Sequence, residues 1–403
     1  MNTDVRIGSA AADPLHPDSR DRPALGKAYF GGPDLPARRL RDVLEAHVAA
    51  VPGGGRIDWV TYYFRDRRLG MALLEAQDRG VSVQVTLEGR PRSARANDRV
   101  RALLEGVGGL GAGLRNIRMW PFPTPPGKLR HPHLHEKLYC FSHPENVALL
   151  GSFNPSGDEP EEDPTMVEEI RDQDRGHNLL VEVRDEKLVE GLRAHAQWLH
   201  GARFPGLLGV LASANRRLLS GTTEIHFLPR FGRHPLLARL DKLGSGARVR
   251  IAGSHVKGAG IVRALTRLAR RTRHVSLLAE DTERRVPSRV ERSLRDAGIT
   301  FQRTWDRSGL PMHNKFVLAE EGERRWTAFG SFNWTTRSFW INREILVIST
   351  DPGLYEAFDR RWRTMWGPGE SGQGSGGLVA PRPAVAARAS HAPVSSTSPS
   401  GSP

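Results

Sequence analysis

The chain has 403 residues, of which 38% are hydrophobic and 26% charged, and its formal net charge is +14. This composition is that of a soluble globular protein with a sizeable core. No apolar run reaches the roughly eighteen residues of a membrane span, and residues 1–22 lack the apolar centre of a secretory signal, so we expect a cytoplasmic protein. The single cysteine, Cys140, excludes an internal disulfide and a cysteine-based zinc site. The positive charge favours anionic partners: nucleic acid, acidic lipid headgroups or small phosphates.

The pattern of strands and helices runs through the chain once and then repeats. The first pass, residues 26–200, predicts strands at 28–30, 57–64, 81–87, 117–120 and 179–183, with helices at 40–51, 69–79, 100–107 and one that ends near Trp198. A linker at 201–220 follows. The second pass, residues 221–367, predicts strands at 225–228, 249–252, 275–279, 301–305 and 345–348, with helices at 236–243, 261–271, 290–297 and one that ends near Trp366.

Alternating strands and helices predict layered α/β domains with mixed sheets and helices on the outside. Two such domains that share an interface place equivalent strand ends face to face, and clefts between domains are common ligand sites. Residues 1–25 and 368–403, which are rich in Pro, Ser, Gly and Ala, are predicted to be disordered tails. We expect the whole chain to be a monomer.

Each pass contains the same two short motifs. His135-Glu136-Lys137 precedes Gly-Ser-Phe-Asn at 151–154, and His313-Asn314-Lys315 precedes the same tetrapeptide at 330–333. A histidine and a lysine two apart on a strand project from the same face. A hairpin then returns the chain to the tetrapeptide, whose glycine permits close backbone approach. Either motif alone is weak evidence of a site, but their joint repetition at nearly the same spacing is strong evidence.

The repeated residues suit a catalytic site for a phosphate ester. Lysine ammonium groups neutralise phosphoryl oxygens, while asparagine amides and serine hydroxyls donate hydrogen bonds to the same charge. One imidazole can attack phosphorus while the other protonates the leaving oxygen, and water then completes the reaction. The candidate residues are His135, Lys137, Ser152, Asn154, His313, Lys315, Ser331 and Asn333.

These motifs resemble those of the phospholipase D superfamily, and the resemblance covers roughly residues 26–367. It implies a duplicated α/β/α sandwich with two mixed-sheet lobes, an active site at their interface, a covalent phosphohistidine intermediate and no metal or other cofactor. The chain departs from the family pattern at the acidic residue five positions after each lysine, which is Ser142 in the first half and Glu320 in the second. This departure bears on the substrate more than on the activity.

The second motif and the downstream Asn342-Arg343-Glu344 resemble the compact nuclease and mitochondrial-type branch, in which a glutamate at the position of Glu344 orients the histidine of the motif. The matching position in the first half is Asn178. A carboxylate raises the pKa of a neighbouring imidazole more than an amide does. The sequence therefore predicts that Glu344 makes His313 the general acid and leaves His135 as the nucleophile.

Two charged segments lie near the motifs. The first is an insertion between Asn154 and Asn178, either a solvated loop or a lid that disfavours a long polyanion; its acidic residues are Asp158, Glu159, Glu161, Glu162, Asp163, Glu168 and Glu169. The second is either a solvated helix face or a surface for the phosphates of nucleic acid or a membrane; its basic residues are Arg267, Arg270, Arg271, Arg273, Arg284, Arg285 and Arg289.

Other conspicuous residues have a structural and a functional interpretation. We expect His131 and His133 to line the mouth of the cleft or to face solvent rather than to bind a metal. We expect His177 to be a structural residue. Most aromatic residues are expected in the core, and Trp334, directly after Asn333, is the best candidate for stacking on a base or packing an acyl chain.

The leading hypothesis is a phospholipase D-type phosphodiesterase that hydrolyses or transfers a phosphodiester, on a phospholipid headgroup, with peripheral contact to an anionic membrane. One alternative is a metal-independent nuclease or nucleic-acid end-processing enzyme. Another is a non-catalytic repeat that binds phosphate or nucleic acid. Two intact His/Lys pairs argue against the last alternative, because a binding module has no need for a paired nucleophile and acid.

Overall fold

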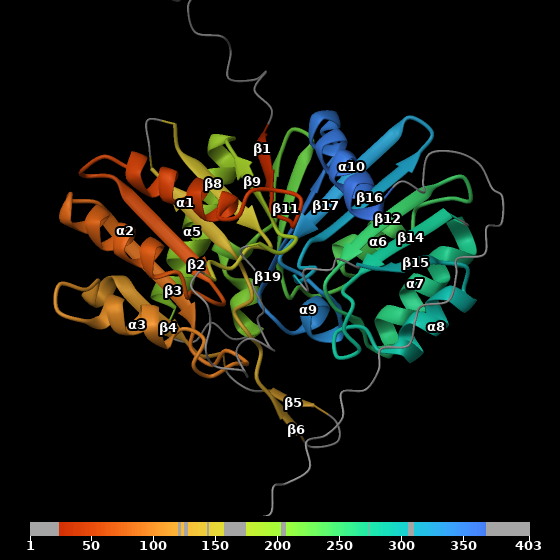
Figure 1. Cartoon of the computed structure of the whole chain (residues 1–403), viewed down its shortest axis with the longest axis horizontal. Helices are drawn as coiled ribbons and strands as arrows, with labels where there is room; N and C mark the ends of the chain where they lie inside the picture. The colour runs from red at the N-terminus through yellow and green to blue at the C-terminus, as the bar shows by residue number, and fades with distance from the viewer. Residues whose placement is uncertain are drawn as a thin grey trace, which may run out of the picture.

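Two large mixed sheets, each flanked by helices, form the fold (Figure 1). The computed structural model describes residues 24–119, 122–124, 128–142, 145–156, 175–202, 207–272, 274–304 and 310–367. The two tails predicted to be disordered lie outside these ranges, except that Leu25 begins the first strand. The acidic stretch 158–169 also lies outside them. No helix in the described ranges is long and apolar enough to cross a membrane.

The first sheet has the strand order β1-β9-β8-β7-β2-β3-β4. Its strands are β1 (Leu25–Phe30), β2 (Arg56–Thr61), β3 (Ser82–Glu88), β4 (Leu114–Ile117), β7 (Leu138–Phe141), β8 (Val147–Gly151) and β9 (Leu179–Val183). Its helices are α1 (Arg39–Ala50), α2 (Arg67–Asp78), α3 (Asp98–Glu105) and α5 (Glu186–Gly201). Strands β2, β3 and β4 pair in parallel, and the others pair antiparallel.

The second sheet has the order β10-β11-β19-β17-β16-β12-β14-β15. Its strands are β10 (Leu218–Ser220), β11 (Thr223–Leu228), β12 (Arg248–Gly253), β14 (His274–Ala279), β15 (Thr300–Arg303), β16 (Lys315–Glu321), β17 (Arg324–Gly330) and β19 (Glu344–Ser349). Its helices are α6 (Pro235–Leu240), α7 (Ala259–Thr272), α8 (Ser288–Asp296), α9 (Thr336–Trp340) and α10 (Pro352–Trp366). From β11 onward, this order and these strand directions match those of the first sheet, as a duplicated fold requires.

Smaller elements complete the chain. Two short strands, β5 (Phe122–Thr124) and β6 (Lys128–Arg130), pair with each other, and so do β13 (Val256–Lys257) and β18 (Trp334–Thr335). The described part of the chain also contains three 3-10 turns: η1 (Gly111–Gly113), η2 (Leu207–Leu211) and η3 (Ser213–Asn215).

Local sequence signals account for many of the boundaries. The side chains of Asp66, Asp185 and Asp351 each accept a hydrogen bond from the backbone three residues on, which caps α2, α5 and α10. Gly80 and Gly298 follow α2 and α8 with φ of 84° and 89°, a conformation that ends a helix and that other residues rarely adopt. The central strands β7, β8 and β19 are buried along their whole length, because helices cover both faces of each sheet.

Among the described residues the core has three large parts, and one of them spans both sheets. Helices α1, α2 and α3 cover the outer face of the first sheet, while α6, α7 and α8 cover the outer face of the second. The third cluster joins α5 and α10 to the inner faces of both sheets, with residues such as Leu150, Val181, Phe316 and Trp362. The two lobes therefore share one continuous apolar interior.

Several predicted boundaries were wrong, and two of them have the same cause. The strand predicted at 57–64 ends at Thr61, so Tyr62 and Tyr63 lie past its carboxyl end. The linker predicted at 201–220 contains β10, which pairs with β11 at the edge of the second sheet. In both places, long-range pairing sets the boundary and local hydrophobicity does not.

Candidate active site

Each motif histidine is held by the backbone of the other repeat. Lys137 directly precedes β7, and Lys315 is the first residue of β16. His135 and His313 lie two residues before these lysines and therefore outside both strands. The His135 amide donates to the carbonyl of Arg343 at 2.9 Å, and the His313 amide donates to the carbonyl of His177 at 2.8 Å. The expectation that each histidine sits within a strand is therefore wrong for both. Instead, each segment crosses over to the opposite repeat.

The side chains of the histidines are paired crosswise as well. Nδ1 of His135 lies 2.8 Å from Oε2 of Glu344, and Nδ1 of His313 lies 2.8 Å from Oδ1 of Asn178. The sequence predicted that Glu344 would pair with His313, and this pairing is wrong. Arg343 and His177, which hold the backbones, directly precede Glu344 and Asn178, so each acceptor necessarily reaches the histidine of the other repeat.

The two motif serines support these acceptors and do not face the cavity. Ser331 Oγ donates to Oε2 of Glu344 at 2.6 Å and accepts from the Ile345 amide at 3.0 Å. Ser152 makes the same pair of bonds, to Oδ1 of Asn178 at 3.1 Å and from the Leu179 amide at 3.0 Å. A hydroxyl has one proton to donate, and here that proton is used. The serines thus orient the acceptors, and the expectation that they donate to phosphate is wrong.

The motif glycines permit this arrangement. Gly151 and Gly330 end β8 and β17, and a Cβ at either position would collide with the carbonyl oxygen of Leu179 or Ile345. Gly330 has a φ of 153°, outside the range of ordinary residues. Because the backbones approach so closely, Ser152 contacts β9, which begins directly after Asn178. In the same way, Ser331 contacts β19, which begins at Glu344.

Both motif lysines are fully buried under the histidines. Nζ of Lys137 donates to the carbonyl of His135 at 2.6 Å, and Nζ of Lys315 donates to that of His313 at 2.8 Å. Burial lowers the pKa of Lys137 to about 7, and burial together with the charge of Lys137 lowers the pKa of Lys315 well below its usual value. Two cations so placed are stabilised by an anion between them.

The same environment favours the neutral form of both imidazoles. Burial first, and then the charges of Lys137 and Lys315, lower the pKa of both His135 and His313 well below the ordinary value. Burial also raises the pKa of Glu344 to about 8, and positive charge on the neighbouring imidazole of His135 would lower that pKa again and favour the carboxylate. A bound phosphate anion would oppose the effect of the lysines on both imidazoles.

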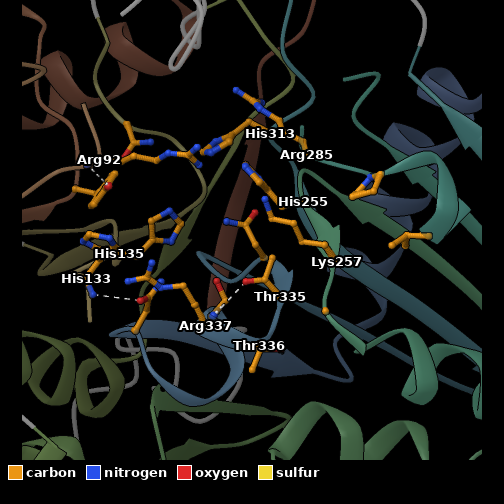
Figure 2. A pocket seen from close by; sticks show the side chains of 18 of the residues that line it. Arg92, His133, His135, His255, Lys257, Arg285, His313, Thr335, Thr336 and Arg337 are labelled. Carbon is orange, nitrogen blue, oxygen red and sulfur yellow. Dashed lines mark hydrogen bonds between the residues drawn. The ribbon is translucent and has the colours of Figure 1, made fainter. Parts of the chain in front are cut away.

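A cavity of about 470 Å³ opens over these residues. Figure 2 shows Arg92, His133 and His135 on one side of it and His255, Lys257 and Arg285 on the other. The motif residues that line it are His135, Asn154, His313 and Asn333. No aspartate or glutamate occurs among the described residues that line the cavity. The site thus brings together all eight predicted motif residues, four of them at the cavity wall and the serines and lysines behind it.

A family model described as cardiolipin synthase, PLD-like domain, matches residues 54–196 and 240–366, which together make up more than half of the chain. The chain belongs to the phospholipase D superfamily. The duplicated sheets and the paired motifs of this superfamily member agree with the fold that its sequence predicted.

Two curated relatives are distant. The mitochondrial cardiolipin hydrolase of Xenopus laevis is 28% identical over 106 residues, which cover 26% of this chain and 48% of that protein. The protein of the same name from Chlamydomonas reinhardtii is 26% identical over 128 residues, covering 32% and 55%. The chain therefore spans about half the length of the curated relatives it matches. The crystal structure of phosphatidylserine synthase from Haemophilus influenzae Rd KW20 superposes with a TM-score of 0.56 at 10% identity, covering 84% of this chain and 86% of that one. At that identity, the likeness shows the fold alone.

The remaining histidines mostly have the roles expected of them. His133 lines the cavity, and burial lowers its pKa to about 3. His177 is buried, with Nδ1 3.0 Å from a nitrogen of Arg361, so it is a structural residue as predicted. His131 is partly buried. No cluster of three potential metal ligands occurs in the ranges that the structure describes.

Trp334 does not contact the cavity. It is fully buried, packs against Phe332 and Phe339, and lies in β18. The prediction that it stacks on a base or packs an acyl chain is therefore wrong. The two residues at the departure from the family motif are structural as well. Ser142 accepts from the Arg56 amide at 2.6 Å, and Glu320 accepts from the hydroxyl of Tyr355 at 3.1 Å.

The predicted basic cluster divides into two groups. Arg267 and Arg270 are exposed on α7, and Arg271 donates to the carbonyls of Leu240 and Leu243, so this group matches the solvated-face interpretation. Arg285 and Arg289 instead line the cavity. Arg273 lies outside the described residues.

Sequence reasoning missed several residues of the site. Glu88 ends β3 and Glu280 directly follows β14, the equivalent strand. They accept from the amides of Leu134 and Met312, each at 2.6 Å, which holds the segment before each motif histidine. His255 and Lys257 line the cavity from the segment that follows β12. Their common signal is a polar residue just past the carboxyl end of a parallel strand, where α/β folds place ligand sites.

Proposed function

We propose that this chain is a metal-independent phosphodiesterase of the phospholipase D type, which hydrolyses or transfers a phosphodiester of a phospholipid headgroup through a covalent phosphohistidine. The observation that carries the proposal is the crosswise pairing of His135 with Glu344 and of His313 with Asn178, both at 2.8 Å. Each acceptor holds the proton on Nδ1 and leaves Nε2 for the substrate. Two imidazoles so oriented, above two buried lysines, suit a nucleophile and an acid better than a simple binding site.

In the proposed first step, Nε2 of His135 attacks phosphorus, and the bond from phosphorus to the leaving oxygen breaks. His313, protonated once the phosphate anion is bound, gives its Nε2 proton to that oxygen. In the second step, water attacks phosphorus, passes a proton to His313, and the P–N bond breaks to free His135. An alcohol in place of water gives transfer. Lys137 and Lys315 stabilise the charge on the phosphoryl oxygens throughout.

The assignment of the two histidines now rests on a different argument from the one that the sequence suggested. A phosphorylated imidazole carries positive charge, and a carboxylate beside it stabilises that charge, whereas an amide does so less. Only His135 of the two has a carboxylate neighbour, Glu344, among the described residues. We therefore keep His135 as the nucleophile and His313 as the acid, with Asn178 holding the tautomer of His313.

The proposal is tested by hydrolysis of bis-p-nitrophenyl phosphate, phosphatidylglycerol and cardiolipin in the presence of EDTA. We expect turnover, and a labelled protein intermediate that is stable to alkali and labile to acid, as a phosphoimidazole is. Lack of turnover on all three substrates would contradict the enzyme assignment. Loss of activity on adding EDTA, restored by a divalent cation, would contradict the metal-independent mechanism.

A further inference from the structure

Tyr62, which directly follows β2, packs against both functional side chains of the first motif. Its ring and the imidazole of His135 meet edge to face, with centroids 5.2 Å apart and ring planes at 62°. Nζ of Lys137 lies over the ring of Tyr62, 5.5 Å from its centroid, which is the distance of a cation–π contact. Tyr62 also lines the cavity, so these contacts occur beside the proposed site of reaction.

The equivalent position of the second repeat has no ring. Strand β2 pairs with β7 as β12 pairs with β16, and this register makes Ser254 the counterpart of Tyr62. Oγ of Ser254 lies 3.0 Å from Nδ1 of His255, and a serine offers no π face. Among the described residues, no aromatic ring contacts His313 or lies over Lys315. The two motif histidines therefore differ in their ring contacts as well as in their acceptors at Nδ1.

The surroundings hold Tyr62 in place from several directions. The Arg92 amide donates to the hydroxyl of Tyr62 at 2.7 Å. Nδ2 of Asn97, a buried residue directly before α3, donates to the carbonyl of Tyr62 at 3.0 Å. The ring of Tyr63 packs on that of Tyr62 at 4.3 Å, and the ring of His133 contacts it at 5.5 Å. A side chain locked in this way can serve as a rigid support for a reacting group.

The imidazole of His135 is held between two groups of different kinds. Oε2 of Glu344, 2.8 Å from Nδ1, sets the direction in which Nε2 points. That hydrogen bond constrains the plane of the imidazole less, because the ring can turn about the bond. The contact with Tyr62 opposes this turning. A nucleophile needs both its direction and its plane set, since a displacement of about 1 Å from the productive geometry can lower the rate by about 10²-fold.

The same ring favours the charged form of the buried lysine. Lys137 is fully buried, and burial lowers its pKa to about 7, while the carboxylates of Glu344 and Glu136 oppose that effect. Lys315 carries the other charge that bears on Lys137. The π face of Tyr62 attracts the ammonium and has no such attraction for the neutral amine. Tyr62 thus supports the nucleophile and the lysine beneath it at once.

We infer that Tyr62 is a positioning residue for the first step of the reaction. Its ring holds the imidazole of His135 in the plane from which Nε2 reaches phosphorus, and it keeps the ammonium of Lys137 in place below. The inference deepens the proposed function and rests on it, since His135 is the proposed nucleophile. The role belongs to the ring and not to the hydroxyl, because the ring makes both contacts.

The test isolates attack by His135 in the His313→Asn background, with bis-p-nitrophenyl phosphate, whose nitrophenol leaves without protonation. The rate and the amplitude of the nitrophenol burst are both measured. Adding Tyr62→Leu, which keeps an apolar side chain without a π face, should slow the burst by about 10- to 100-fold at unchanged amplitude. Adding Tyr62→Phe, which keeps the ring, should retain most of the rate. Tyr355→Leu, a matched change at a buried tyrosine of α10 outside the cavity, should leave the rate unchanged.

Folding and positioning are separated by this design, because loss of folded protein lowers the amplitude of the burst and not its rate. An equal burst rate with and without Tyr62→Leu would overturn the inference. An equally slow burst in Tyr62→Phe would assign the effect to the hydroxyl and overturn the role of the ring. An equally slow burst in Tyr355→Leu would show a general effect of destabilisation, with the same consequence.

Lysine NMR distinguishes a failure of the proposed function. In protein labelled at the Cε of lysine, the signal of Lys137 is identified by its loss in Lys137→Arg, and its pKa is measured by titration. Tyr62→Leu should lower that pKa by about 0.5 or more, because the ring favours only the charged form, whereas Tyr62→Phe and Tyr355→Leu should not. If wild type shows no turnover but this fall is seen, the contact stands and the catalytic proposal fails. If the pKa of Lys137 is the same in all variants, the contact is wrong whatever the enzyme hydrolyses.

Discussion

Oε2 of Glu344 lies 2.8 Å from Nδ1 of His135, although the two residues are 209 positions apart and belong to different repeats. The same carboxylate accepts from Ser331 at 2.6 Å and from Ser338 at 2.7 Å, so its orientation is set from three sides. Asn178 takes the equivalent place beside His313. One site thus has a carboxylate on one histidine and an amide on the other, and this asymmetry supports a division of labour.

Replacing Glu344 by glutamine should slow the reaction strongly while the fold is retained. The amide keeps the shape of the side chain but no longer stabilises positive charge on His135. We expect kcat for bis-p-nitrophenyl phosphate to fall by about 10²- to 10⁴-fold, the range seen when the carboxylate that orients a catalytic histidine is removed. Glu320→Gln, a matched change in the second sheet away from the cavity, should have little effect. Equal activity in both variants would contradict the role given to Glu344.

Leaving-group dependence separates the roles of the histidines. p-Nitrophenol leaves without protonation, whereas the alkoxide of glycerophosphoglycerol needs an acid. His313→Asn should therefore release a burst of about one equivalent of nitrophenol and then stall, because the same residue activates water in the second step. His135→Asn should release none. Mass spectrometry should place the trapped phosphoryl group on His135, and a group found on His313 would reverse the assignment.

Local sequence patterns were sufficient for some features of this protein. The order of strands and helices, the two lobes and the eight motif residues all follow from periodicity and from a repeated motif. The crosswise pairing cannot be predicted from these patterns, because it depends on how the two sheets dock. Either acceptor has the chemistry to bind either histidine. Glu344 was predicted to lie beside a motif histidine, and it does, but that histidine is His135 and not His313.

Two further errors have the same origin in non-local contacts. Trp334 follows a cavity residue, Asn333, but pairing of β18 with β13 turns the indole into the core between Phe332 and Phe339. That same pairing fixes Lys257 in its place at the cavity wall. A strand of two residues is too short to show a hydrophobic periodicity. Neither the burial of Trp334 nor the position of Lys257 could therefore be predicted from the sequence.

The shared core predicts that the two lobes unfold together. Nε2 of His195, on α5, lies 2.7 Å from Oε2 of Glu136, and its ring stacks on Phe227 of the second sheet at 3.8 Å. Both His195 and Glu136 are fully buried. His195→Leu leaves the carboxyl group without this partner and should lower the free energy of unfolding by about 3 kcal/mol or more.

Urea unfolding followed by tryptophan fluorescence measures this effect. His274→Leu, at an exposed histidine on β14, is the matched control and should change the free energy of unfolding by less than about 0.5 kcal/mol. A single transition is expected in every case. Two separate transitions would show that the lobes are independent.

The pH dependence of kcat/KM should report the ionisation of the buried Lys137. Burial lowers the pKa of Lys137 to about 7, and in the free enzyme its ammonium form is therefore lost as the pH rises through that value. Because kcat/KM reflects the free enzyme, it should fall above about pH 7. Bound phosphate stabilises the ammonium and raises its pKa, so kcat should hold to higher pH than kcat/KM does. Lys137→Arg, whose guanidinium stays charged, should shift the midpoint of the alkaline decline in whatever activity it keeps, because only Lys315 of the two lysines then titrates, whereas Lys242→Arg, at an exposed lysine outside the cavity, should leave the midpoint unchanged. A wild-type kcat/KM that stays level to pH 9 would show that Lys137 keeps its proton without substrate.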